Sequence, residues 1–349
     1  MKPRFLEQPL AATLLAATSI CSLFSSAASE AATPTIVDTA YVQAALQHGA
    51  ILWDVRSAGA YKQGHIPGAV NVDEVTASVR NENTEDYLPL PQLERTLGNA
   101  GIDPAREVIV YGPKGSPNVY FALVTLQYLS GANAASQAHI YHGGIDDWAA
   151  AGQPLATEAT RLAPLTLKLS VRPELLADTK EVLAKLHDPG VQILDVRTPG
   201  EFRGEDIRAI RGGHIPGAIP INYVENQVDP DAATKFEKKQ VANKDGMDLK
   251  PREALRALYA NLDPDKETIV YCQSGVRASE TATVLQDLGF KKVKVYDSSW
   301  LGYGNTLAAP AEDVSFVNVG MLQGKIGALQ KRLDTMEREM AGMKAAGKP

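Results

Sequence analysis

The chain has 349 residues, of which 44% are hydrophobic and 22% are charged, and its formal net charge is −6. This composition and length are typical of a globular protein with about two domains. The negative net charge and the lack of a basic stripe argue against nucleic acid as a partner. The sequence contains neither a metal-ligand cluster nor a dinucleotide-binding glycine motif, so we expect no metal or other cofactor.

The N-terminus has the pattern of an export signal. Lys2 and Arg4 give a basic start, residues 9–24 are mostly apolar or small, and residues 25–28 are small enough for cleavage after Ala28. We therefore expect a signal peptide over residues 1–28 and an exported, periplasmic protein. An uncleaved leader is one alternative, and a lipid anchor on Cys21 is another.

Removal of the leader leaves Cys272 as the single cysteine of the chain. A lone cysteine in an oxidising compartment has no partner for an intramolecular disulfide. This suits a protein that needs a free thiol.

Short apolar runs rich in β-forming residues alternate with helical patterns along the chain. In its first half we predict strands and helices at residues 50–53, 93–97, 108–111, 120–129 and 138–141. Such alternation predicts an α/β fold of βαβ units, with a mainly parallel sheet flanked by helices.

The second half of the chain repeats the first. Asp54 corresponds to Asp195, His65 to His214 and Tyr111 to Tyr271, and each pair lies within a longer run of matching residues. The spacing between partners grows along the chain, so the second copy has gained two insertions. We predict two domains, at residues 33–155 and 174–311, joined by a linker at residues 156–173 that is rich in Ala, Pro and Thr.

A cysteine loop follows the last of these matched strands in the second copy. Residues 272–277 read Cys-Gln-Ser-Gly-Val-Arg and separate the apolar run 268–271 from a helical pattern that starts at Ala278. Loop amides and the first N–H groups of a helix favour negative charge, so this loop should stabilise a thiolate on Cys272. The competing interpretation is a small cysteine that only fills core space.

The first copy lacks this chemistry. Matching Tyr111 with Tyr271 places Gly112 opposite Cys272, and the loop that follows Gly112 contains no thiol and no closing arginine. We therefore predict that the first copy is catalytically inactive and that it provides structure and one wall of a cleft.

The C-terminal segment, residues 312–349, predicts an amphipathic helix with a heptad seam over residues 319–343. Its a and d positions are Val319, Leu322, Ile326, Leu329, Leu333, Met336, Met340 and Met343. In a parallel dimer, Arg332 at g would face Glu337 at e of the second copy. We predict that this helix forms a homo-oligomeric coiled coil. The alternative is that it packs against its own domain, since Met in the seam and Gly at 320, 324 and 327 weaken a zipper.

The two copies and the loop resemble the rhodanese sulfurtransferases of the tandem-domain type, which include thiosulfate and 3-mercaptopyruvate sulfurtransferases. Three separated signatures carry the resemblance and occur in the order of that family: residues 193–197 (Ile-Leu-Asp-Val-Arg), 213–218 (Gly-His-Ile-Pro-Gly-Ala) and the cysteine loop. The resemblance implies two rhodanese-like domains, with only the second active. It also implies that Cys272 takes a sulfane sulfur from a small anionic donor, holds it as a persulfide, and passes it to a thiol or to cyanide.

The resemblance also suggests roles for particular residues. We expect the backbone of Gln273, Ser274, Gly275, Val276 and Arg277 to stabilise the thiolate and the persulfide. Arginines in this stretch of two-domain sulfurtransferases bind substrate, so we expect Arg277 and one or more of Arg203, Arg208 and Arg211 to bind the donor. His65, His214, Asp195 and Arg197 are expected to be scaffold, and residues 297–303 either wall the pocket or pack in the core.

The loop departs from the two best-known patterns of the family, which leaves the donor open. Ser274-Gly275-Val276 matches the mercaptopyruvate enzymes, but Arg277 stands where those enzymes have Thr, and this favours thiosulfate. A cysteine-loop phosphatase or arsenate reductase is the alternative enzyme. It is disfavoured because phosphatases related to this family have a loop one residue longer. A non-enzymatic sulfur carrier or binding protein is the third alternative.

Overall fold

The computed structural model describes residues 1, 34–131 and 137–346, with side chains described as far as Met343. The predicted signal peptide and Cys21 lie outside the described residues, so export stays a prediction. No helix in the described ranges is both long enough and apolar enough to cross a membrane.

The first copy is built on one parallel five-stranded sheet in the order β1-β5-β4-β2-β3. Its strands are β1 (Ile36–Val37), β2 (Ile51–Asp54), β3 (Val70–Asn71), β4 (Val108–Tyr111) and β5 (Ala138–Tyr141). Its helices are α1 (Thr39–Gln47), α2 (Ala58–Gln63), α3 (Val75–Val79), α4 (Leu90–Asn99), α5 (Pro117–Leu129) and α6 (Gly144–Ala150). The predicted strands correspond to β2, β4 and β5, and the predicted helices lie within α4 and α5.

The second copy repeats this plan with a parallel sheet in the order β6-β11-β10-β7-β9. The strands are β6 (Leu176–Ala177), β7 (Val191–Asp195), β9 (Ile219–Pro220), β10 (Glu267–Tyr271) and β11 (Lys292–Tyr296). The helices are α7 (Thr179–Lys185), α8 (Pro199–Phe202), α9 (Ala232–Glu237), α10 (Arg252–Leu258), α11 (Val276–Leu288) and α12 (Ser299–Asn305). Three short 3₁₀ helices, η1 (Pro173–Leu175), η2 (Tyr223–Asn226) and η3 (Asp245–Met247), complete it.

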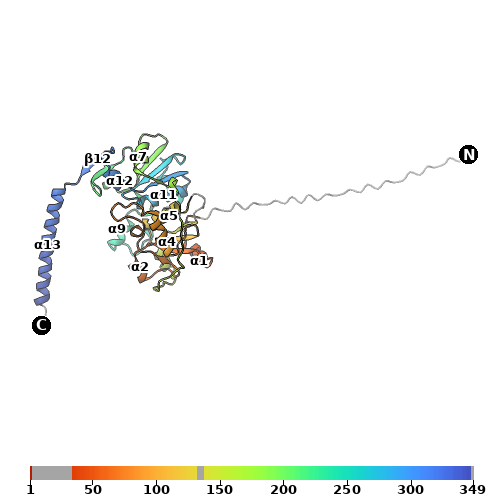
Figure 1. The fold of residues 1–349 in the computed structure, drawn as a ribbon, viewed down its shortest axis with the longest axis horizontal. Coiled ribbons are helices and arrows are strands. Elements are labelled where there is room, and N and C mark those ends of the chain that lie inside the picture. Colours follow the sequence, from red (N-terminus) through yellow and green to blue (C-terminus); the bar gives the residue numbers. More distant parts are fainter. Residues whose placement is uncertain (2–33, 132–136, 347–349) are drawn as a thin grey trace. The chain divides into compact units, whose positions relative to one another are not determined.

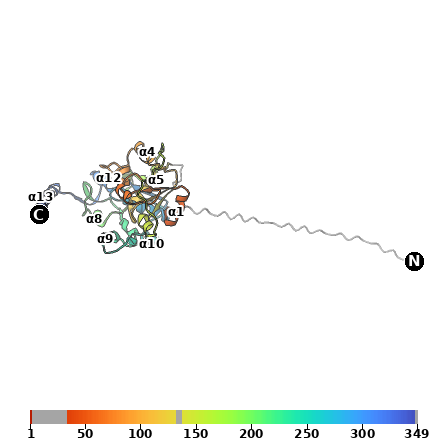
Figure 2. The same ribbon diagram turned by 90° about the horizontal axis from the view of Figure 1, so that it is seen from below.

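Apolar side chains cover both faces of each sheet, as parallel sheets require. The two copies meet where α5 packs against α11, and these two helices lie beside each other in Figure 1. Figure 2 shows α5 from below, next to α4 of the same copy. Val124 of α5 belongs to the same buried cluster as Cys272, and Val276 of the cysteine loop packs against the core of the first copy. The predicted linker lies against the first copy rather than free of it: the Leu165 amide donates to the Gly98 carbonyl oxygen at 2.8 Å.

One element boundary differs from the prediction. The C-terminal helix α13 spans Val319–Ala346, whereas residues 312–316 form strand β12 (Glu312–Phe316), which pairs antiparallel with β8 (Arg211–His214). The expected helix start at residue 312 was therefore wrong, because this segment completes a two-stranded sheet with the insertion of the second copy. The second domain extends to Phe316.

Candidate active site

Cys272 directly follows β10, at the edge of the sheet where the carboxyl ends of the parallel strands meet. Its residue surface is 1% exposed. The loop then turns at Gly275, whose φ of +81° lies in the left-handed region that favours glycine, and α11 begins at Val276. Ligands collect at this edge in parallel α/β sheets, so the fold places the thiol where the sequence predicts it.

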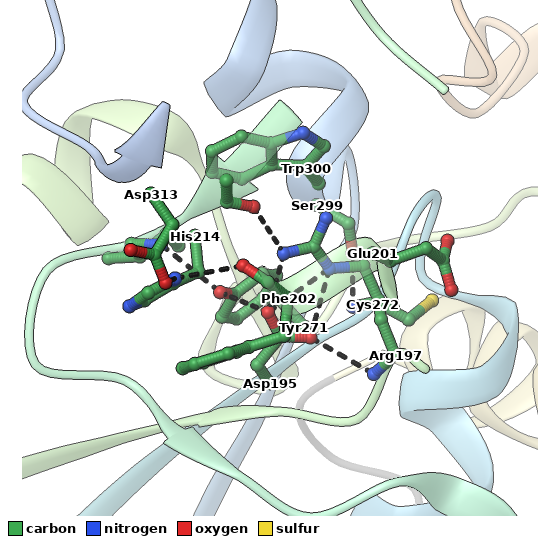
Figure 3. A network of polar contacts seen from close by, with 12 residues as sticks. Asp195, Arg197, Glu201, Phe202, His214, Tyr271, Cys272, Ser299, Trp300 and Asp313 are labelled. Atoms are coloured by element: carbon green, nitrogen blue, oxygen red, sulfur yellow. Dashed lines mark hydrogen bonds and ion pairs between the residues drawn. The ribbon is translucent and has the colours of Figure 1, made fainter. Parts of the chain in front are cut away.

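The backbone of the loop is fastened to α12 and leaves several amides without an acceptor. The N–H group of Cys272 donates to the Ser299 hydroxyl at 3.1 Å (Figure 3), and that of Gly275 donates to the same hydroxyl at 3.0 Å. The hydroxyl in turn donates to the Tyr296 carbonyl oxygen at 2.6 Å. Within the described ranges, the N–H groups of Gln273, Ser274, Val276 and Arg277 have no acceptor. These amides, at the start of a helix, are suited to bind an anion next to the thiol.

Ser299, which accepts both of these hydrogen bonds, has an unusual backbone conformation. Its φ is +48°, a region that L residues other than Gly rarely adopt. The next residue, Trp300, donates its N–H to the Cys272 carbonyl oxygen at 3.0 Å. Ser299 was not predicted as a site residue. Comparison of the two copies could have found it, because the corresponding residue of the first copy is Gly144.

Arg277 closes the loop and is anchored by a carboxylate. Its guanidinium donates to both oxygens of Glu201, at 2.7 and 2.9 Å. Glu201 is in turn held at the start of α8 by a capping box with Thr198. Burial alone would raise the pKa of Glu201, but the hydrogen bonds and charge of Arg277 outweigh it and lower the pKa to about 2. The pair is therefore ionised at neutral pH, and the Arg277 side chain is held in one position.

The three other predicted arginines lie in different environments. Arg208 also contacts Glu201, at 3.2 Å, and its side chain is 57% exposed. With Arg277 it borders a cavity of about 410 Å³, and with Ser274 and Val276 it borders a second cavity of about 560 Å³. Arg208 is therefore the one that lies at the loop with Arg277.

Arg203 and Arg211 do not join this group. Arg203 is exposed, pairs with Glu205 at 2.8 Å, and lines a different cavity, which no loop residue borders. Arg211 is buried, and its guanidinium donates to the carbonyl oxygens of Thr306 and Ala309 at 3.1 and 2.8 Å. Nη2 of Arg211 thus holds the chain between α12 and β12, and Arg211 borders neither cavity at the loop, which does not favour it as the residue that binds the donor.

The residues expected to be scaffold make structural contacts. Arg197 forms a fork with Asp195 and also donates to the Gly213 carbonyl oxygen at 2.7 Å. His214 stacks on Phe202, with ring centroids 3.6 Å apart (Figure 3), and its Nε2 lies 3.0 Å from the Glu312 carboxylate. Trp300 and Tyr303 are buried in the core, so the stretch 297–303 packs in the core at these two positions rather than lining the pocket.

Residues of both copies line the cavity of about 560 Å³ over the loop. The second copy contributes Arg208, Ser274 and Val276, and the first copy contributes Glu74, Thr76, Ala77, Arg80, Asn81, Glu82, Glu85 and Asn118. The first copy thus forms one wall of the approach to the loop. No group of three or more His, Cys, Asp or Glu side chains in the described part of the chain is arranged to hold a metal ion.

The chain resembles known proteins over both of its copies. The model of the rhodanese-like domain family matches residues 38–151 and 178–306. The thiosulfate sulfurtransferase of Azotobacter vinelandii is 30% identical over 284 residues, which cover 81% of this chain and 98% of that protein. The sulfur carrier protein TtuD of Thermus thermophilus is 30% identical over 265 residues, covering 72% of this chain and 86% of that protein.

A solved structure shows the same fold at lower identity. The anaerobic ergothioneine biosynthesis enzyme from Chlorobium limicola matches with a TM-score of 0.67 and 20% identity, over 80% of this chain and 70% of that chain.

Proposed function

The chain belongs to the rhodanese family, with two rhodanese-like domains in tandem, and is a rhodanese-type sulfurtransferase; from this premise we propose that Cys272 carries the sulfur as a persulfide and that thiosulfate is its donor. The observation that carries the proposal is the position of the Cys272 thiol in a loop whose amides of Gln273, Ser274, Val276 and Arg277 have no acceptor among the described residues. An anionic sulfur on Cys272 would find those donors already in place.

The proposed reaction has two steps. The Cys272 thiolate attacks the outer sulfur of thiosulfate, the S–S bond breaks, and sulfite leaves with the bonding electron pair. A nucleophile, such as cyanide or a thiolate, then attacks the terminal sulfur of the persulfide, takes it up, and restores the thiolate. Atoms and electrons balance without an added oxidant or cofactor.

The charges at the loop support an anionic donor. Arg277 and Arg208 share the single carboxylate of Glu201, so this group of three side chains carries a net positive charge. A guanidinium presents two parallel donors, which suits the oxygens of a sulfonate or carboxylate group. We propose that Arg277 and Arg208 bind the donor, with Arg203 too far out to take part directly.

Steady-state transfer to cyanide, measured with thiosulfate and with 3-mercaptopyruvate in parallel, tests this function. We expect the higher kcat/KM with thiosulfate. A higher kcat/KM with 3-mercaptopyruvate would overturn the choice of donor, and no transfer from either compound would overturn the proposed reaction.

A sulfur-carrier role uses the same persulfide and differs in the acceptor. The likeness to TtuD, which is named a sulfur carrier protein, favours a protein thiol as a second candidate acceptor. Transfer of labelled sulfur from the loaded protein to a thiol peptide at a rate above that to cyanide would support this candidate.

We further propose that the protein is exported, with residues 1–28 removed. The support is the basic, apolar and small-residue pattern of the leader and the single cysteine that remains. Mass measurement of the protein from a periplasmic extract should give a chain that starts at residue 29. An intact N-terminus would contradict cleavage.

We also propose that α13 associates with α13 of a second copy. Its seam side chains are exposed, including Val319, Ile326 and Leu333 at a and Leu322 and Leu329 at d. Val and Ile at a with Leu at d favour two parallel strands, and Arg332 would then face Glu337 of the other helix.

Truncation after Asn318 tests this association and keeps β12 intact. Light scattering should show a dimer for the full chain and a monomer for the truncated one, with kcat per site unchanged. A full-length monomer would contradict the coiled coil. A lower Tm without a change in oligomeric state would instead indicate packing of α13 on its own domain.

A further inference from the structure

We infer that Arg80, in the copy without a nucleophile, is a positioning residue for sulfur transfer, because it crosses the domain interface and holds the Ser274–Gly275 peptide of the cysteine loop. The inference rests on the proposed function of Cys272. It assigns the first copy a direct part in shaping the active loop.

Arg80 directly follows α3, and its side chain extends to the cysteine loop past two aromatic side chains. Its side chain is 3% exposed, and its guanidinium carbon lies 4.2 Å from the ring centre of Phe121 and 5.5 Å from that of Tyr87. Both rings belong to the first copy. They fix the plane of the guanidinium by stacking.

The two ends of the guanidinium bind the second copy. Nη1 donates to the Ser274 carbonyl oxygen, and Nη2 donates to a carboxylate oxygen of Asp297, which directly follows β11. One side chain of the first copy therefore ties the cysteine loop to the adjacent strand end of the second copy.

The Ser274–Gly275 peptide is held on both of its polar groups. Arg80 binds its carbonyl oxygen, while the Gly275 N–H donates to the Ser299 hydroxyl at 3.0 Å. Space is tight at this point, since a Cβ on Gly275 would lie 2.8 Å from the Asp297 carbonyl oxygen and 3.0 Å from Nη2 of Arg80. The peptide cannot rotate while Arg80 is in place, so its carbonyl oxygen, which carries partial negative charge, stays on the domain interface and away from the anion-binding amides.

The charge of Asp297 depends on the same contact. Burial raises the pKa of Asp297 to about 6, although Arg80 lowers it, and the nearby carboxylates of Asp86 and Glu85 add to the rise. Loss of Arg80 alone would leave this buried carboxyl without its cation, which is costly in any protein interior. The test therefore removes both charges together.

The main variant is Arg80→Met with Asp297→Asn, which keeps the volume of the side chains. The matched control is Arg56→Met with Asp54→Asn. Arg56 and Asp54 form a comparable ion pair in the same copy, and the Arg56 side chain contacts Asp54, the Gly64 carbonyl oxygen and the Tyr111 ring, all in the first copy. The readouts are kcat and KM with thiosulfate, and hydrogen exchange of the peptide that contains residues 272–277.

We expect the main variant to lose at least about tenfold in kcat with little change in KM, because a misplaced loop affects the reacting sulfur more than donor binding. Exchange of the loop amides should become faster. The control should change neither readout, even where its Tm falls. A main variant that is folded and keeps kcat within about twofold of wild type would overturn the inference.

Arg80→Lys provides a second variant if the double variant does not fold. A single ammonium group cannot bind Ser274 and Asp297 with the fork geometry of Arg80, so we expect an intermediate loss of kcat with a folded protein. Wild-type kcat in Arg80→Lys would again overturn the inference. If wild-type protein transfers no sulfur, the proposed function fails, whereas faster loop exchange in the Arg80 variants would still support the positioning contact.

Discussion

The two copies share a frame of buried Asp, Arg and Tyr side chains, although the loops that follow β4 and β10 are very different. In the first copy Arg56 bonds Asp54 at 2.6 Å and the Gly64 carbonyl oxygen at 2.7 Å, and in the second copy Arg197 makes the matching contacts at 2.6 and 2.7 Å. Tyr111 and Tyr271 likewise each donate to the matching aspartate. The frame is therefore the same in the copy with Cys272 and in the copy without it, as expected of buried residues that serve the fold.

The differences are concentrated at the loop. Where the second copy has Cys272, Arg277, Glu201 and Ser299, the first has Gly112, Pro117, Ala60 and Gly144. The residues around the Cys272 loop therefore differ together between the two copies. This comparison identifies Glu201 and Ser299 as parts of the site, although neither has a reactive group of its own in the proposed reaction.

Each loop is also covered by the other copy. Arg80 of the first copy binds the cysteine loop, and Met247 of the second copy lies against the corresponding loop of the first copy, since a Cβ on Gly115 would lie 2.7 Å from the Met247 Cβ. His142 Nε2 also lies 3.0 Å from the Met247 carbonyl oxygen.

The nucleophile gives the largest expected effect. Cys272→Ser should lower sulfur transfer to below a tenth of wild type with little change in Tm, because serine is nearly isosteric but cannot form a persulfide. Thiosulfate:cyanide turnover and thermal melting check this. Higher residual turnover would contradict the role of Cys272.

The inactive loop should not be rescued by a thiol alone. Adding Gly112→Cys to Cys272→Ser should restore no activity, because Pro117 and Ala60 stand where Arg277 and Glu201 are needed. A Cβ at residue 112 would also lie 3.1 Å from a Val119 methyl carbon. Recovery of turnover in the double variant would show that the loop of the first copy can support sulfur transfer.

Ser299→Gly makes the active copy resemble the inactive one at a single position. We expect kcat to fall roughly tenfold, because the amides of Cys272 and Gly275 lose their shared acceptor. Tm should change little, since glycine relieves the positive φ. Ser299→Ala is the control: it should lose as much kcat and also lower Tm, because alanine keeps the strained backbone. Wild-type kcat in both variants would contradict the role of Ser299 in the site.

The smallest expected effect concerns the helices that join the copies. Glu280 of α11 occupies the position that Tyr120 holds in α5. Burial raises the pKa of Glu280 to about 8, and the side chain of Asn226 offsets this rise only in part. Folded protein keeps this proton at neutral pH, whereas the unfolded chain releases it above about pH 4.5. Stability should therefore fall as pH rises from about 4.5 to 8.

Glu280→Gln removes this dependence. The variant should match wild type near pH 5 and be more stable at pH 7, by as much as about 3 kcal/mol, with the difference reaching its full size near pH 8. Thermal melting of both proteins across this range measures the difference. An equal difference in Tm at every pH would show that Glu280 does not carry a proton in the folded protein.

Much of this site could be predicted from the sequence. The repeat, the Cys272 loop and the loss of thiol and arginine in the first copy follow from matched local runs. Arg80, Arg211 and β12 could not be predicted in this way, because their roles depend on partners far along the chain. Arg80 donates to Ser274 across the domain interface. Arg211 donates to a carbonyl oxygen that follows α12, and the strand at residues 312–316 forms only because it can pair with β8.

Intact mass spectrometry of the protein after incubation with thiosulfate tests the central claim most directly. The account predicts a gain of one sulfur atom, about 32 Da, located on Cys272 by peptide mapping and removed again by cyanide. The Cys272→Ser protein should show no gain. An unchanged mass in the wild-type protein, or the same gain in Cys272→Ser, would contradict the claim that Cys272 carries the sulfur.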